Sequence, residues 1–148
     1  MTTDPVDVQD LVATAGDEPW EGMPAGTVLG HVHLHVGDLD RAAAFYSGVL
    51  GFDRTVWNYP GALFFGADGY HHHVGTNLWA GPAAQPPAAD EAQLLGWEIV
   101  LSDPASLAAA RASAAGAGYT PTPEAAAADG GFGLADPWGI PVRLRAAR

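Results

Sequence analysis

The sequence contains no cysteine and no lysine, and both absences limit what the protein can do. Without cysteine there is no disulfide framework, no thiolate metal site and no cysteine nucleophile. Six basic residues stand against 17 acidic ones, which gives a formal net charge of −11. Because no basic patch is available to neutralise phosphates, nucleic acids and anionic membranes are not expected as partners.

Long apolar runs are also missing. The sequence shows no stretch of membrane-spanning length and no charged segment followed by the apolar run of a signal peptide. The composition, 48% hydrophobic and 16% charged over 148 residues, suits one domain with its own core. We therefore expect a cytoplasmic globular protein that acts on a small molecule.

All six histidines lie in two short runs, at 31, 33 and 35 and at 71–73. In the first run histidine alternates with aliphatic residues, so in a strand the three imidazoles share one face and the aliphatic side chains share the other. Imidazole is the commonest side-chain ligand of transition metals. We expect one ring of each run to bind a metal and the others to lie near the metal or the substrate.

The segment 41–50 is predicted to be a helix. It has apolar residues at helical spacing, Asp38 or Asp40 to cap its start and Gly51 to end it. Packed on the aliphatic face of the histidine strand, this helix would leave the imidazoles on an open face.

The order of expected elements occurs twice. After the first strand and helix, three strands are predicted, and after a linker over 81–90 the pattern starts again. The predicted elements of the two halves are strands over 52–58, 62–65 and 71–79, then a strand over 95–101, a helix over 107–115 and strands over 119–123, 131–135 and 142–144. This repeat predicts an α+β fold of two βαβββ modules, about 28–80 and 94–146, that form one cup-shaped mixed sheet within a single domain over 28–148.

Residues 1–27 differ from the rest. They are predicted to form a helix over 6–15, with Asp4 as a possible cap, followed by a connector rich in glycine and proline. The segment has no core of its own, so it must pack on the domain or on a partner.

Several motifs resemble those of the vicinal oxygen chelate superfamily, which includes glyoxalase I, bleomycin and fosfomycin resistance proteins and extradiol catechol dioxygenases. They are GHVHLHV, DLDRAAAFYSGVLGF, GYHHHVGTNLW and the DPWG turn before the last strand. The closest resemblance is to the carboxyl-terminal half of two-domain catechol 2,3-dioxygenases. It extends over nearly the whole chain.

The resemblance implies an oxidoreductase that cleaves a catechol ring next to its diol, with Fe(II) held by two histidines and a carboxylate. Mn(II) or another divalent metal is also compatible with it. Matched by position, the metal ligands are His31 and His72, and a one-residue slip to His71 or His73 stays open. His33 is the expected acid, base or hydrogen-bonding neighbour, and His73 is expected to face the substrate.

Two positions depart from the family pattern. The glutamate of the last strand is replaced by Arg143, which cannot coordinate iron because it has donors only. The residue nearest to the family's active-site histidine on the third strand is Gly66. The third ligand would then be another clustered histidine, a water or a carboxylate from the second subunit of a homodimer. Glu98 is an acidic residue of the second module, and strand alternation points it away from Trp97 and Ile99.

Three functions therefore stay open. The first is a metal-dependent enzyme, which we favour because the loss of one ligand does not explain six clustered histidines. The second is a metal-free isomerase, lyase or ligand-sequestering protein in which Arg143 pairs with an anionic ligand. The third is a binding protein of the resistance type, with Trp57, Trp79 and Trp97 as aromatic walls. Trp97 and Arg143 are accordingly predicted to bind substrate.

Overall fold

The computed structural model describes residues 5–17, 19–123 and 130–147, and within them the same unit occurs twice. The first unit consists of β1 (Val32–His35), α2 (Leu39–Ala43), the π-helix η1 (Ala44–Val49), β2 (Asp53–Val56), β3 (Ala62–Gly66) and β4 (Val74–Asn77). The second consists of β5 (Trp97–Leu101), α3 (Pro104–Gly116), β6 (Thr122–Pro123), β7 (Phe132–Ala135) and β8 (Pro141–Ala146). The predicted α+β fold and its two βαβββ modules are confirmed.

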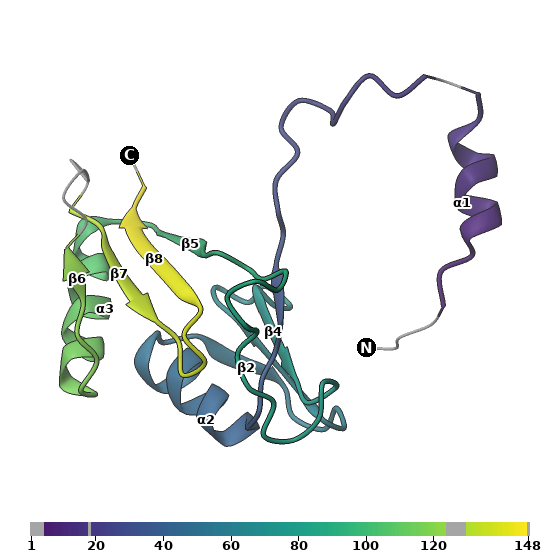
Figure 1. The fold of residues 1–148 in the computed structure, drawn as a ribbon. Coiled ribbons are helices and arrows are strands. Elements are labelled where there is room, and N and C mark those ends of the chain that lie inside the picture. The colour runs from purple at the N-terminus through teal and green to yellow at the C-terminus, as the bar shows by residue number, and fades with distance from the viewer. Residues whose placement is uncertain (1–4, 18, 124–129, 148) are drawn as a thin grey trace.

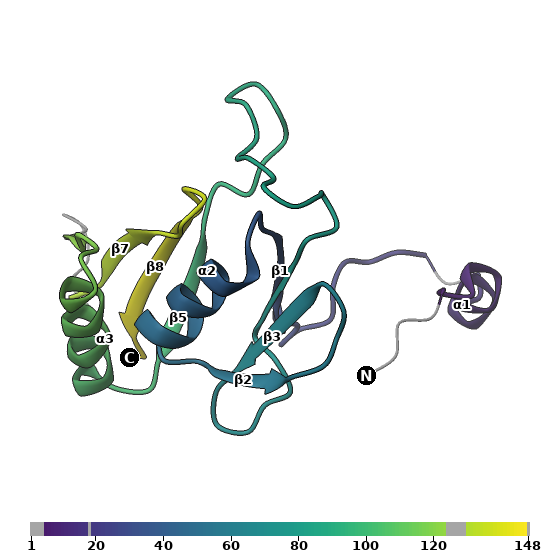
Figure 2. The same ribbon diagram turned by 90° about the horizontal axis from the view of Figure 1, so that it is seen from below.

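Each module forms a four-stranded sheet, in the orders β1-β4-β3-β2 and β5-β8-β7-β6. The first and last strands of a module pair in parallel, and the other pairs are antiparallel. We expected one cup-shaped sheet, but no strand ladder joins the two sheets in the described part of the chain. The helix α2 lies between them (Figures 1 and 2). The two sheets are therefore separate in their hydrogen bonding.

The helix that was predicted over 41–50 begins two residues earlier, at Leu39, because Asp38 and not Asp40 is its N-cap. The Asp38 carboxylate accepts the backbone N–H of Arg41 at 2.8 Å, and the chain leaves the helix at Gly51, whose φ is +82°. Its second half differs from the regular helix that we predicted, because the Leu50 N–H bonds to the carbonyl of Phe45 across a widened turn. Side-chain periodicity does not distinguish such a turn from an α-helix.

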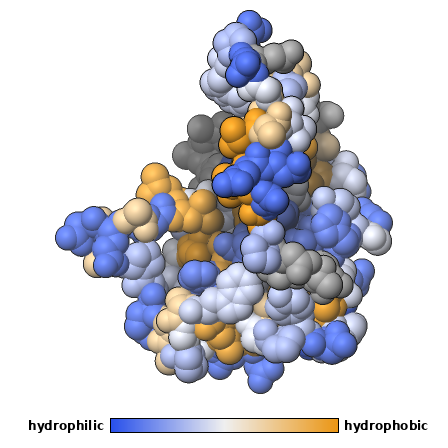
Figure 3. Space-filling view, turned by 90° about the vertical axis from the view of Figure 1, so that its right-hand side faces the viewer, coloured by the Kyte–Doolittle hydropathy of each residue, from blue (hydrophilic) through white to orange (hydrophobic). Residues whose placement is uncertain are grey.

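An amino-terminal arm stands apart from the body of the molecule (Figures 1 and 2). Its helix α1 (Val8–Ala15) starts at Asp7, whose side chain accepts the N–H of Asp10. The helix is thus shorter than the predicted one, and the expected cap Asp4 lies outside the described residues. No residue of α1 is buried, and its large apolar side chains belong to the mixed hydrophobic and hydrophilic surface on this side (Figure 3). None of the described helices has the length and apolar character needed to cross a membrane.

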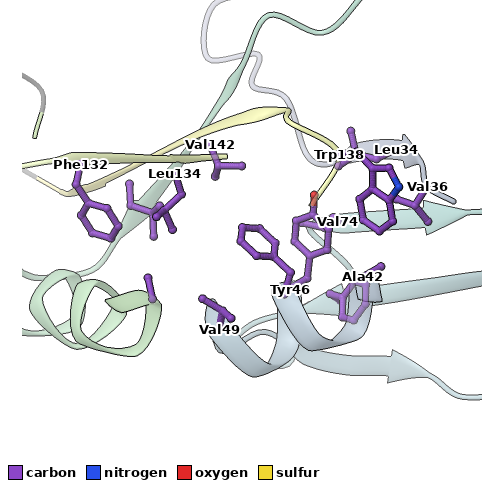
Figure 4. Close-up of a cluster of buried hydrophobic side chains, with 14 of the residues drawn as sticks. Leu34, Val36, Ala42, Tyr46, Val49, Val74, Phe132, Leu134, Trp138 and Val142 are labelled. Carbon is purple, nitrogen blue, oxygen red and sulfur yellow. The ribbon is translucent and has the colours of Figure 1, made fainter. Parts of the chain in front are cut away.

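One buried core joins the modules, and Tyr46 of η1 lies at its centre (Figure 4). The Tyr46 hydroxyl donates to Oδ2 of Asp136 at 2.8 Å, and the other oxygen of this carboxylate accepts the N–H groups of Trp138 and Ile140. Burial, followed by the negative charge of Asp136, raises the pKa of Tyr46 well above its ordinary value, so the phenol stays a donor. The Arg41 guanidinium adds a second link by donating to the carbonyl of Pro137 at 3.1 Å.

Replacing Tyr46 with Phe is expected to destabilise the fold by about 1–3 kcal/mol, because the buried carboxylate of Asp136 loses a donor. Urea unfolding followed by circular dichroism measures this loss. Tyr119→Phe is the matched control, since the Tyr119 ring packs on Phe45 but its hydroxyl bonds to no described side chain. Equal stability of Y46F and the wild type would show that the hydrogen bond does not hold the modules together.

Candidate functional site

The first sheet brings the two histidine runs together. Val32 of β1 is in register with Val74 of β4, and the Val32 N–H bonds to the carbonyl of His73 at 3.0 Å. This pairing places the rings of His31 and His72 with their centroids 4.6 Å apart. The aliphatic residues of the first run face the core, so the predicted division of the strand into an imidazole face and an apolar face is confirmed.

His72 is buried, with only 8% of its surface exposed, and its Nδ1 has no hydrogen-bond partner in the described chain. Burial lowers the pKa of His72, and the nearby rings of His31 and His71 lower it further. The ring is therefore neutral at neutral pH. A neutral imidazole can offer a lone pair to a metal.

The neighbours of His72 are placed differently. His71 is exposed and packs on Tyr70, with ring centroids 4.3 Å apart. Nδ1 of His73 accepts the backbone N–H of Ala67 at 3.2 Å, which ties that ring to the turn after β3. Of the three consecutive histidines, His72 is the one in ring contact with His31. Its role as a ligand, and that of His73 toward substrate, stay predictions.

His33 lies across Gly75 of β4. A Cβ atom at Gly75 would stand 3.1 Å from the imidazole ring, so the close approach depends on glycine. The ring packs at 5.2 Å from Trp79 and at 6.0 Å from Phe64. Burial lowers the pKa of His33, with smaller contributions from His31 and His35, and a neutral imidazole of this kind can accept a proton.

The described residues supply only part of a metal site. The neighbouring imidazoles of His31 and His72, one with an unpaired buried nitrogen, fit the donor chemistry of a divalent transition metal. Nowhere in residues 5–17, 19–123 and 130–147 do three histidine, aspartate or glutamate side chains form a group that could hold a metal ion. A complete coordination sphere would need at least one donor beyond this pair.

Arg143 lies on the open face of the second sheet. It stands in register with Glu98 of β5 and forms an ion pair with that carboxylate, whose other oxygen accepts Nε of Arg145 at 2.7 Å. Burial alone would raise the pKa of Glu98, but hydrogen bonds from the two guanidinium groups outweigh it and lower the pKa below its ordinary value. As alternation predicted, Glu98 faces away from Trp97, and this direction puts it beside Arg143.

A cavity of about 700 Å³ opens on this face, lined among others by Arg143, Glu98, Thr122 and Gly133. No histidine is among the described residues that line it. The structure therefore does not bring Arg143 to the His31–His72 pair within the chain. The two predicted parts of the site occupy separate faces.

The tryptophans named as aromatic walls are not gathered in one place. Trp97 borders the cavity of the second sheet, but its ring packs toward Tyr46 at 6.4 Å and its Nε1 is buried without a partner among the described residues. Trp57 is exposed beneath the guanidinium of Arg54. Only Trp79 lies beside a histidine of the first sheet, at His33.

Sequence analysis missed Phe64, Gly75 and Tyr70. Phe64 packs on His33 and His72, and the alternation of β3 with its neighbours could have placed it on the imidazole face. Gly75 has no side chain, so the sequence does not indicate that the His33 ring packs against it. Tyr70 follows a sharp turn, and only the folded backbone brings it against His71.

Known proteins share this architecture. The sequence model of one family, the Glyoxalase/Bleomycin resistance protein/Dioxygenase superfamily, matches residues 28–144. A catechol-2,3-dioxygenase of Bacillus subtilis (strain 168) is 50% identical over 103 residues, which are 68% of this chain and 36% of that protein. The chain thus spans little more than a third of the length of this curated relative.

Solved structures show the same fold at low identity. A glyoxalase/dioxygenase from Nostoc punctiforme superposes with a TM-score of 0.67 at 14% identity, covering 88% of this chain and 99% of the other. A fosfomycin resistance protein from Listeria monocytogenes, solved with Mn(II) and sulfate, has a TM-score of 0.60 at 15% identity and covers 85% and 93%. At these identities the likeness concerns the fold.

Gly75→Ala is expected to displace the His33 ring and to destabilise the protein by about 1–3 kcal/mol, because the new methyl group enters a close contact. The pKa of His33, followed by NMR, should rise toward its ordinary value as the ring leaves its packed position. Gly116→Ala is the control, since a Cβ there meets open space. An unchanged His33 titration in G75A would contradict the proposed dependence of the ring on Gly75.

Proposed function

Because the chain belongs to the Glyoxalase/Bleomycin resistance protein/Dioxygenase superfamily, we propose that it is a metal-dependent oxidoreductase resembling extradiol dioxygenases. Its substrate would be a small catechol or another oxygenated aromatic compound. The 50% identity to a catechol-2,3-dioxygenase supports this class. The observation that carries the proposal is the contact between the His31 and His72 rings, because it joins the two histidine runs of the sequence in one place.

In this proposal His31 and His72 hold Fe(II), with Mn(II) or another divalent metal as an alternative. Such a metal, when bound, supplies a Lewis acid that favours the ionised form of a diol. His33 takes up a proton from the substrate, since its lowered pKa leaves it neutral and it lies on the same face. Trp79, which is 58% exposed, packs on His33 and offers apolar surface to a flat ring.

The incomplete donor set also has a consequence for assembly. A second copy of the chain could place a carboxylate near His31 and His72, and a water or another clustered histidine would serve the same purpose. We propose a homodimer, because the histidine pair and the cavity beside Arg143 lie on different sheets of one chain, an arrangement that suits a site completed between subunits.

A second candidate function is favoured by the pair of Glu98 and Arg143. In it the protein is a metal-free isomerase, lyase or small-molecule binding protein, and an anionic ligand enters the cavity of the second sheet. Glu98 holds the two guanidinium groups of Arg143 and Arg145 in fixed positions, which suits them for recognition of a planar carboxylate.

Elemental analysis of untagged protein, loaded with Fe(II) under exclusion of air, tests the first proposal. We expect about one iron per chain in the wild type and less than about a tenth of that in His31→Ala and His72→Ala, because each variant leaves a single imidazole of the pair. His35→Ala is the matched control, since His35 is an exposed histidine of the same strand. Iron at background level in the folded wild type would refute the metal-dependent function.

A calorimetric titration with benzoate tests the second candidate. Arg143→Gln should weaken binding by about 10–100-fold, the effect of losing a charged hydrogen bond. Glu98 keeps Arg145 as a partner in this variant, so the sheet should stay folded. Arg54→Gln, on the other sheet, should bind benzoate like the wild type. No binding by the wild type, or equal binding by R143Q, would exclude this use of the cavity.

A further inference from the structure

We propose that Tyr70 is a substrate-contacting residue of the His31–His72 site and that its phenol hydroxyl donates a hydrogen bond to a substrate oxygen. The inference rests on the proposed metal-dependent function and deepens it. It adds a specificity residue to the site and narrows the ligand to aromatic compounds with an anionic oxygen.

A series of ring contacts links Tyr70 to the His31–His72 pair. The Tyr70 ring packs on His71 at 4.3 Å, His71 packs on His72 at 4.6 Å, and His72 packs on His31 at 4.6 Å. Tyr70 also lies near the residue before His31. Its hydroxyl is 3.6 Å from the position that a Cβ atom would take on Gly30. The hydroxyl is therefore at the edge of the pair, beside the backbone that carries His31.

The hydroxyl is available to a ligand. Tyr70 is 41% exposed, and its hydroxyl makes no hydrogen bond to any residue that the structure describes. Its ring also packs on His73, with the centroids 4.6 Å apart. Tyr70 is thus packed against imidazoles, and a large part of its surface stays exposed.

The backbone holds Tyr70 in this position from both sides. The turn after β3 passes through two residues with positive φ, Asp68 at +53° and Gly69 at +75°, and the Tyr70 N–H bonds to the carbonyl of Ala67 at 3.0 Å. On the other side the hydroxyl of Thr55 donates to the carbonyl of His71 at 2.6 Å. These two bonds hold the backbone that carries the Tyr70 side chain.

Gly66 is part of the same arrangement. A Cβ there would stand 2.2 Å from the backbone oxygen of Tyr70, a distance that no side chain tolerates. The glycine that departs from the family pattern at this position is therefore required by the close approach of Tyr70. Glycine at position 66 of β3 and the position of the Tyr70 backbone therefore depend on each other.

The chemistry of the group indicates its ligand. A phenol hydroxyl forms a short hydrogen bond with an anionic oxygen, and such charge-assisted bonds are about twice as strong as neutral ones. The exposed ring of Trp79, which follows β4, lies next to His33. A planar aromatic compound with an ionised hydroxyl could contact both kinds of group.

Anaerobic titration of Fe(II)-loaded protein with 4-nitrocatechol, followed by visible absorbance, tests the proposal. Tyr70→Phe should bind the probe about 10–100-fold more weakly, with iron content and unfolding temperature equal to those of the wild type. The ring contacts with the histidines survive in this variant, and only the hydroxyl is lost. Tyr119→Phe, which removes the hydroxyl of a tyrosine that packs on Phe45, should bind like the wild type.

Three outcomes would contradict the proposed role of Tyr70. Equal probe affinity in iron-loaded Y70F would overturn the role of Tyr70 and leave the proposed function intact. Loss of iron or of thermal stability in Y70F would overturn it as well, since Tyr70 would then act by supporting the fold. A wild type that holds no iron and binds no probe would overturn the proposed function and the Tyr70 inference together.

Discussion

The contact between Tyr46 and Asp136 decides how the two halves of this protein meet. It joins the helix of the first module to the turn before the last strand of the second, and it does so in a buried setting where an unpaired carboxylate would be costly. Asp136 also binds the N–H groups of its own turn, so the turn and the helix are fixed together. With the helix held between them, the two sheets stay separate (Figure 2).

This separation explains the distribution of chemical groups. The first sheet carries the histidines, Phe64 and Trp79, and the second carries Glu98, Arg143 and Arg145. Neutral imidazoles suit a divalent metal, whereas paired guanidinium groups suit an anion. A site that uses both sets needs a second chain. Among the described residues, the histidine set alone still needs at least one further donor to complete a metal site.

Much of this could be predicted from local patterns. The alternation over 31–36 predicts the imidazole face, Asp38 and Gly51 predict the limits of the first helix, and the repeat of strand and helix signals predicts two modules. Contacts between residues far apart in the sequence could not be predicted in this way. Nothing local to Trp97 or Glu98 shows which face of the strand is open, and the position of Tyr70 depends on the approach of its carbonyl to Gly66, which periodicity does not encode.

In the proposed function, His31 and His72 hold one metal ion together. Anomalous diffraction from crystals soaked in Mn(II) would test this directly, because it locates the ion without reference to activity. We expect one strong peak within bonding distance of both imidazoles, with any further ligand visible beside it. A peak at another site, or no peak in crystals with both rings ordered, would contradict the account.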